Sequence, residues 1–117
     1  MTGMITKILK VVTTMLLALG VSYAMADPVW IDVRTVEEFT ADHIDGDANI
    51  PLAEIDVNAL AASYGKDAEL MLYCRSGNRA GQALTLLEAA GFSNVTNAGG
   101  ISDVRELRDI ELVTVTP

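Results

Sequence analysis

Short apolar runs alternate with stretches of helical periodicity along this chain, most clearly near its middle. Leu70 to Tyr73 is a continuous apolar run, which is typical of a strand buried on both faces of a sheet. Six mostly polar residues follow, from Cys74 to Arg79. Apolar residues then recur at the spacing of one helix face as far as Gly91: Ala80, Ala83, Leu84, Leu87 and Ala90. This pattern predicts a strand at 69–73, a loop, and a helix at about 78–90.

The rest of the chain repeats this alternation. Further strands are predicted at 29–33, 48–50 and 93–97, and a helix at 57–64 with Asp56 as its N-cap and Gly65 as its stop. Alternating strands and helices predict an α/β fold, a small parallel sheet with helices on both faces. The tail at 111–116 alternates weakly and fits either an edge strand or a frayed end.

Two more helices are predicted from local signals. Thr35-Val-Glu-Glu38 fits a capping box, in which the Thr hydroxyl and the Glu carboxylate each accept a hydrogen bond from a backbone N–H. Val36 and Phe39 are expected to face the core. Gly99 and Gly100 are expected to form a tight turn rather than to bind a ligand, and a short helix capped by Ser102 should follow.

The first 26 residues have the pattern of a signal peptide. Two lysines precede an apolar run over 11–21, and a small-x-small cleavage site ends at Ala26. The run is about half the ~20 residues that a membrane-spanning helix needs, so an uncleaved membrane anchor is the less favoured alternative. No cysteine lies near the cleavage site, which excludes a lipid anchor. We expect export to the periplasm, a single mature domain over 27–117, and no stable membrane association.

The chain is strongly acidic, with 16 Asp and Glu against 8 Lys and Arg and a formal net charge of −8. Lys7 and Lys10 belong to the predicted leader, which contains no acidic residue, so the mature domain is more acidic still. Such a charge disfavours nucleic acid and anionic membranes as partners. A site for a small anion must therefore be built locally.

Cys74 is the only cysteine, and it stands where the predicted strand 69–73 ends. A single cysteine in an exported protein is either an intermolecular partner or a free reactive thiol. The helix start that follows, the backbone freedom of Gly77 and the charges of Arg75 and Arg79 all favour a thiolate, so we predict a lowered pKa for Cys74. The alternative is a small buried hydrophobe, but the sequence turns polar and basic directly after Cys74.

The loop from Cys74 to Arg79 has the spacing Cys-x4-Arg and resembles the active-site loop of rhodanese-type sulfurtransferases. The resemblance covers about residues 29–104. Asp42 and Asp47 depart from it, because the family usually has Gly and Ala at these places, which bears on local packing and substrate preference. The other segments that resemble the family are Trp30-Ile-Asp-Val-Arg34, Glu38-Phe39, His43-Ile44 with Gly46, Asn49-Ile-Pro51 and Asn97-Ala-Gly-Gly100.

The resemblance implies a rhodanese-like fold and thiosulfate sulfurtransferase activity without a cofactor. Cys74 would be the catalytic nucleophile, taking the outer sulfur of thiosulfate as a persulfide and passing it to cyanide or a thiol. The protein is expected to be a monomer with these small molecules as its partners. The residues expected to bind the substrate are Arg75, Ser76, Gly77, Asn78 and Arg79, with Arg75 meeting the substrate and Arg79 orienting the loop.

Several other polar residues are expected to have structural roles. An Asp at a strand end readily caps neighbouring backbone, so Asp32 and Arg34 are assigned to structure rather than to substrate. His43 is the only histidine, and a thiolate stabilised by N–H groups needs no base, so a catalytic role for it is disfavoured. Trp30 is expected to pack in the core or at an edge. One Cys and one His do not make a metal site.

Two other functions remain open from the sequence. Cysteine phosphatases of the tyrosine type use Cys-x5-Arg, and Tyr73 stands where they place a histidine. The shorter loop here narrows the cradle, which disfavours a phosphoryl group and favours a single sulfur carried on cysteine. A persulfide carrier without turnover, or a rhodanese module used only for protein contacts, is the other alternative, although the presence of Cys74 with Arg75 and Arg79 argues for catalysis.

Overall fold

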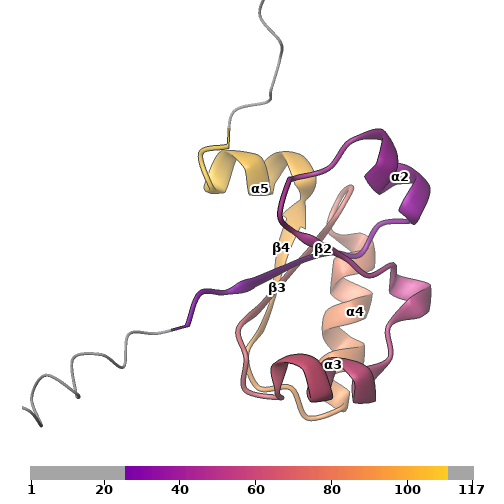
Figure 1. Ribbon diagram of the computed structural model, residues 1–117, viewed down its shortest axis with the longest axis vertical. Helices are drawn as coiled ribbons and strands as arrows, with labels where there is room; N and C mark the ends of the chain where they lie inside the picture. The colour runs from indigo at the N-terminus through magenta and orange to yellow at the C-terminus, as the bar shows by residue number, and fades with distance from the viewer. Residues whose placement is uncertain (1–25, 111–117) are drawn as a thin grey trace, which may run out of the picture.

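A computed structural model describes residues 26–110, so most of the predicted leader and the C-terminal tail from 111 lie outside the described residues. Its centre is a four-stranded sheet in the order β2-β1-β3-β4, with every neighbouring pair parallel (Figure 1). The predicted parallel α/β fold is confirmed. The strands are β1 (Val29–Asp32), β2 (Ala48–Asn49), β3 (Leu70–Cys74) and β4 (Val95–Gly100).

The helices begin and end largely where the sequence signals predict. The Thr35 hydroxyl accepts a hydrogen bond from the Glu38 N–H, and the Glu38 carboxylate accepts one from the Thr35 N–H, so the predicted capping box is present. Asp56 caps the next helix, which ends at Gly65 with a φ of 82°. The helical elements are α2 (Val36–Ala41), the 3-10 turn η1 (Leu52–Glu54), α3 (Val57–Tyr64), α4 (Asn78–Ala89) and α5 (Ile101–Leu107).

Each face of the sheet carries its own cluster of buried side chains, because successive residues of a strand point to opposite faces. Leu70, Leu72 and Cys74 of β3 face the cluster that contains Ala83 and Leu87 of α4. Tyr73 faces the other way. Its cluster includes three more buried residues: Ile44, Ile101 and Val104. The sheet is therefore covered by α3 and α4 on one face and by α5 on the other (Figure 1).

Two sequence predictions near the C-terminus are wrong. The fourth strand was expected at 93–97 but β4 is Val95–Gly100, because pairing with β3 continues until Gly100 lies opposite Cys74. Ser102 was expected to cap the last helix, but α5 begins after Gly100, whose N–H donates to the Asp103 carboxylate at 2.9 Å. The glycine pair thus ends a strand that reaches the Cys74 loop instead of forming a separate turn.

The expected core contact of Val36 is also wrong, since this residue is 51% exposed. The α2 helix has six residues and buries none of them completely. Phe39 is half-buried and stacks on His43 with ring centroids 4.3 Å apart. The helix is therefore held by its capping box and by polar contacts more than by an apolar face.

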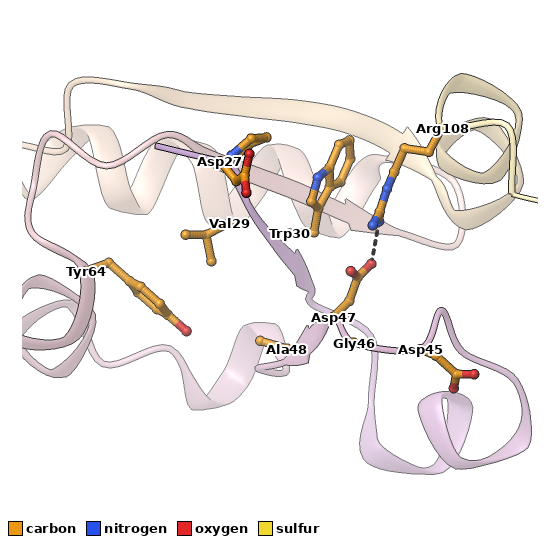
Figure 2. Close-up of a pocket in the computed structure, with 10 residues that line it drawn as sticks. Asp27, Val29, Trp30, Asp45, Gly46, Asp47, Ala48, Tyr64 and Arg108 are labelled. Carbon is orange, nitrogen blue, oxygen red and sulfur yellow. Dashed lines mark hydrogen bonds and ion pairs between the residues drawn. The ribbon is translucent and has the colours of Figure 1, made fainter. Parts of the chain in front are cut away.

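The two acidic departures from the family pattern each pair with an arginine near the end of α5. Arg105 donates to both carboxylate oxygens of Asp42, at 2.9 and 2.7 Å. Arg108 donates to Asp47 at 2.8 Å and lies over the ring of Trp30, 4.3 Å from its centroid (Figure 2). These contacts fasten α5 to the segment between α2 and β2.

Asp47 also accepts a hydrogen bond of 2.6 Å from the hydroxyl of Tyr73, a residue with no exposed surface. Burial, together with the Asp47 carboxylate, raises the pKa of Tyr73.

The cavity beside this cluster has a volume of about 510 Å³ and is lined by Trp30, Asp47, Tyr64 and Arg108 among others, but not by Cys74 (Figure 2). Within residues 26–110, no helix has the length and apolar character needed to cross a membrane.

Replacing Asp47 with Ala should destabilise the domain, because it leaves the buried Tyr73 hydroxyl without its acceptor. The expected loss is about 1–3 kcal/mol in the free energy of unfolding, measured by urea denaturation. Asp45→Ala is the matched control: its side chain is 96% exposed and the expected change is within about 0.5 kcal/mol. Adding Tyr73→Phe to Asp47→Ala should recover part of the loss. Equal effects of Asp47→Ala and Asp45→Ala would contradict this assignment.

Candidate active site

The Cys74 loop lies at the point where the order of the sheet changes direction. From β1 the chain moves to β2 on one side, and β3 then pairs with β1 on the other side before the chain moves to β4. Ligands of open α/β sheets bind outside the carboxyl ends of the strands at such a switch point. Cys74 is the last residue of β3, and α4 begins four residues later at Asn78.

The sulfur of Cys74 is surrounded by backbone N–H groups. The Gly77 N–H donates to Sγ at 2.9 Å. Burial raises the pKa of the Cys74 thiol. Hydrogen bonds from the backbone N–H groups of Ala80, Ser76, Gly77 and Arg79 together lower it by more, so the net pKa lies below its usual value. The loop can therefore hold a sulfur anion without a basic side chain. Cys74 has no exposed surface, so a substrate reaches the sulfur only after a neighbouring group moves.

Glycines allow the loop to close around the sulfur. Gly77 has a φ of 92°, in the left-handed region, and a Cβ there would lie 3.3 Å from the Cα of Gly99. A Cβ on Gly100 would collide with the carbonyl of Arg75. Asn97 joins the two segments, since its amide donates to the Gly77 carbonyl and accepts from the Gly99 N–H, both at 2.9 Å. The end of β4 is therefore a support for the loop.

Arg79, at the end of the loop, is bound by Glu38 of α2. Its two terminal nitrogens donate to the two Glu38 oxygens at 2.5 and 3.0 Å. These hydrogen bonds, aided by those from Thr35, lower the pKa of Glu38 from 4.5 to about 2 against the opposing effect of burial. Arg79 therefore has a partner within the chain and is fixed in one orientation, as expected for a residue that orients the loop.

The remaining predicted loop residues face outward. Arg75, Ser76 and Asn78 are exposed, and Arg75 takes part in no ion pair among residues 26–110. Arg75 lines a cavity of about 440 Å³. The other residues of that cavity are Arg34, Glu38, Ala41, Asp42, Ile101 and Ser102. The structure thus places Arg75 at an open, polar cavity beside the loop, here called the polar entrance, which Cys74 itself does not line, and it places Arg79 against Glu38.

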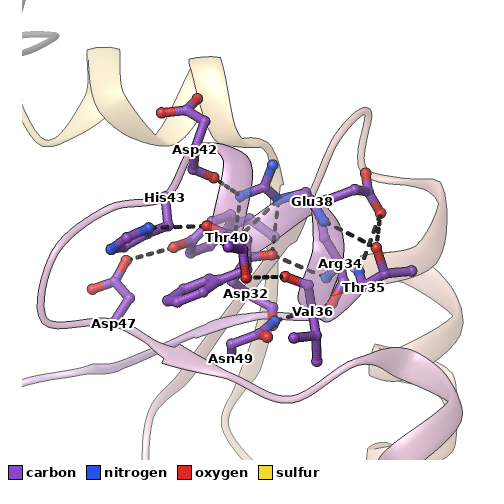
Figure 3. A network of polar contacts seen from close by, with 12 residues as sticks. Asp32, Arg34, Thr35, Val36, Glu38, Thr40, Asp42, His43, Asp47 and Asn49 are labelled. Atoms are coloured by element: carbon purple, nitrogen blue, oxygen red, sulfur yellow. Dashed lines mark hydrogen bonds and ion pairs between the residues drawn. The ribbon is translucent and has the colours of Figure 1, made fainter.

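Asp32 and Arg34 form a buried ion pair behind this entrance. Arg34 donates to Asp32 through its backbone N–H, Nε and Nη2, at distances between 2.8 and 3.1 Å, and through Nη2 to the carbonyl of Asp42 at 2.6 Å (Figure 3). Asn49 donates to the carbonyls of both residues at 3.0 Å. These contacts tie the ends of β1 and β2 together, the structural role expected from the sequence.

His43 makes its contacts away from Cys74. Its Nδ1 lies 2.9 Å from the Phe39 carbonyl and its Nε2 lies 3.1 Å from Asp45. Neither nitrogen contacts the sulfur, so the histidine is not positioned as a base for it. In the described part of the chain, no group of three or more His, Cys, Asp or Glu residues is placed to hold a metal ion.

Glu38, Asn97 and Gly100 support the site but were not identified as site residues from the sequence. Glu38 was assigned to a capping box and to the family resemblance, and its pairing with Arg79 spans 41 residues. Asn97 was placed at the end of a strand and Gly100 in a tight turn, and neither was assigned a supporting contact with the loop. A parallel sheet brings distant strand ends to the same edge, which was the available signal that Asn97 and Gly100 of β4 meet the loop.

Comparison with known proteins gives a consistent result. A family model described as the rhodanese-like domain matches residues 21–107. The chain is 37% identical to the thiosulfate sulfurtransferase PspE of Escherichia coli (strain K12) over 92 residues, which covers 76% of this chain and 88% of that protein. It is 34% identical over 67 residues to the putative sulfur carrier protein YrkF of Bacillus subtilis, of which the match covers 35%.

Solved structures show the same likeness. A rhodanese with anions from E. coli is 37% identical and superposes with a TM-score of 0.60, covering 66% of this chain and 91% of that chain. The human single-domain sulfurtransferase TSTD1 is 30% identical with a TM-score of 0.55, covering 86% of this chain and 92% of that chain. These likenesses extend over nearly the whole length of both solved proteins.

Replacing Glu38 with Gln should weaken the support of Arg79. At neutral pH we expect a loss of about 0.5–2 kcal/mol, because the bidentate ion pair becomes a single hydrogen bond from the Arg79 guanidinium to a neutral amide oxygen. The pKa of Glu38 is lowered in the folded state, so its contribution is complete above about pH 4.5 and is lost as the pH falls towards 2. The difference in melting temperature between wild type and Glu38→Gln should therefore shrink over that range.

Glu37→Gln is the matched control for Glu38→Gln, because Glu37 is the exposed neighbour in the same first turn of α2. It should melt close to the wild type at neutral pH. A Glu38→Gln protein that differs from the wild type by the same amount at pH 7 and at pH 2.5 would show that the ion pair does not contribute to stability.

Proposed function

The chain belongs to the rhodanese family of sulfurtransferases, and from this premise we propose that it transfers sulfane sulfur from thiosulfate to a thiophilic acceptor through a persulfide on Cys74. The observation that carries the proposal is the ring of N–H groups around Sγ, which lowers the thiol pKa although the residue is buried. A thiolate is the reactive form in sulfur chemistry, and the same N–H groups can stabilise a persulfide anion.

In the first step the Cys74 thiolate attacks the outer sulfur of thiosulfate. The new Cys74–sulfur bond forms as the sulfur–sulfur bond of thiosulfate breaks, and sulfite leaves with the electron pair. Arg75, exposed at the polar entrance, meets the dianion. In the second step cyanide or a thiolate attacks the outer sulfur of the persulfide, which releases thiocyanate or a new persulfide and regenerates the Cys74 thiolate.

The loop geometry favours sulfur over a phosphoryl group. Ser76, Gly77, Arg79 and Ala80 direct their N–H groups at Sγ itself and leave the sulfur fully buried, which suits one additional sulfur atom better than a tetrahedral group with three outer oxygens. A rhodanese from E. coli that this chain resembles was solved with anions, and we propose that this chain also takes an anionic substrate. Metal ions have no role in the proposed steps.

Turnover by small molecules is favoured over a carrier role, because Arg75 has no ion-pair partner in the described residues and is available to a small anion. The similarity to a putative sulfur carrier keeps transfer to a partner protein as the second candidate.

We also propose that residues 1–26 direct export to the periplasm and are removed, on the basis of the leader pattern alone. The mature protein would begin at Asp27 and act as a monomer.

The direct test is the intact mass of the purified exported protein before and after thiosulfate, and again after cyanide. The wild type should gain one sulfur atom and lose it as thiocyanate, whereas Cys74→Ser should do neither, since no other cysteine is present. The starting mass also reports whether the chain begins at Asp27. A free, titratable thiol with unchanged mass would contradict the proposal. A stable persulfide that cyanide and small thiols cannot discharge would favour the carrier.

A further inference from the structure

A second opening, different in character, is lined in part by Arg79 of the Cys74 loop. It is a groove of about 270 Å³, here called the Leu52 groove. Its lining residues are Val33, Thr35, Pro51, Leu52, Ala53 and Arg79. Four of the six are apolar side chains, and a groove of this size fits a molecule smaller than the drug-sized ligands that occupy pockets of about 300 Å³ or more.

The Leu52 groove adjoins the side of the sheet to which Cys74 points. Val33, at its base, is buried in the same cluster of contacting side chains as Cys74, and Leu52 packs against that cluster. The Leu52 N–H donates to the Val33 carbonyl at 3.0 Å, which holds these two lining residues together. Arg79 belongs both to the loop and to the groove. Cys74 does not itself line the groove, but a molecule there contacts Arg79 of the loop and Val33 of the cluster that contains Cys74.

Charge distinguishes this groove from the entrance at Arg75. Arg79 is the only charged residue that lines the groove, and Glu38 neutralises it through two hydrogen bonds. A small dianion placed there would lose its hydration without finding an unpaired cation. The net charge of −8 further repels anions from the protein surface. The groove consequently suits an uncharged body with an apolar part.

We propose that the Leu52 groove is the acceptor subsite, and that it binds a small thiol with an uncharged, apolar body. This inference rests on the proposed sulfur transfer, in which two unlike molecules must reach the same sulfur. Thiosulfate approaches from the polar entrance at Arg75, and the acceptor thiol lies in the groove. Its thiolate attacks the outer sulfur of the Cys74 persulfide, the bond between the two sulfurs breaks, and the product is the acceptor persulfide with the Cys74 thiolate.

The test measures discharge of the preformed Cys74 persulfide by ethanethiol, propanethiol and butanethiol, with 3-mercaptopropionate as the anionic comparison. These alkanethiols have nearly equal nucleophilicity, so differences in rate report binding of the chain. The second-order rate constant should rise roughly two- to fourfold for each methylene. It should be lowest for 3-mercaptopropionate. Equal rates along the alkyl series would overturn the proposal.

Ala53→Asp tests the position of the subsite, because Ala53 is exposed and lines the groove, so the substitution adds a charge without disturbing the core. It should lower the rate constant for butanethiol about tenfold relative to that for cyanide. Ala59→Asp is the control, since Ala59 is also exposed and does not line the groove. It should behave as the wild type. Equal effects of the two substitutions would place the acceptor elsewhere.

A second measurement separates this inference from the proposed function. Alkyl methanethiosulfonates transfer an alkylthio group directly to a free thiolate, so they probe the groove without any persulfide. Modification of Cys74 should be faster with the butyl than with the methyl reagent, and Ala53→Asp should remove the difference. If thiosulfate leaves no sulfur on Cys74 but this preference persists, the sulfur transfer fails and the apolar subsite stands. If a persulfide forms but neither series depends on chain length, the subsite is wrong.

Discussion

The structure depends on keeping one sulfur anion inside a protein. Burial opposes the charge on Cys74, and the backbone N–H groups of the loop reverse that effect. N–H groups that stabilise an anion are effective only when the backbone holds them in place, because water competes with any that turn away. The surrounding fold can be understood as the set of contacts that keep residues 75–80 in this arrangement.

Those contacts come from three parts of the chain. Glu38 of α2 holds Arg79, Asn97 of β4 bridges Gly77 and Gly99, and Gly100 lies against the Arg75 carbonyl. The α5 helix follows Gly100 directly and is fastened by the Asp42–Arg105 and Asp47–Arg108 ion pairs. These two aspartates, which depart from the usual family pattern, thus connect the segment between α2 and β2 to α5 and, through Gly100, to the end of β4 that supports the loop. The electrostatics of the site is built from backbone N–H groups and paired side chains, whereas Arg75 has no ion-pair partner among residues 26–110.

Much of this fold could be predicted because its signals are local. The apolar run before Cys74, the Thr35 capping box and the Gly65 stop each act through neighbouring residues, and each is confirmed. The position of Cys74 at a strand end followed from the same pattern. The failures involve contacts between distant segments. Glycines have low strand propensity, so the extension of β4 to Gly100 is visible only once its pairing with β3 is known.

The same limit applies to the site. Spacing alone indicated a Cys-x4-Arg loop, but the partner of Arg79 and the support from Asn97 require the tertiary structure. Val36 was expected to face the core, and it is exposed because α2 is short and held by polar contacts. The two cavities, one polar at Arg75 and one apolar at Leu52, also appear only in three dimensions. The family of the chain was readable from the sequence, whereas the proposed separation of donor and acceptor was not.

The measurement that tests the central claim most directly is the pH dependence of alkylation of Cys74 by iodoacetamide, in the native protein and in urea. Because the chain contains one cysteine, the rate reports a single thiol. The structure predicts a native pKa below that of the unfolded chain, which should lie near the ordinary value of ~8.5. A native pKa equal to or above the unfolded one would mean that burial outweighs the N–H groups, and the loop could not then be a cradle for a sulfur anion.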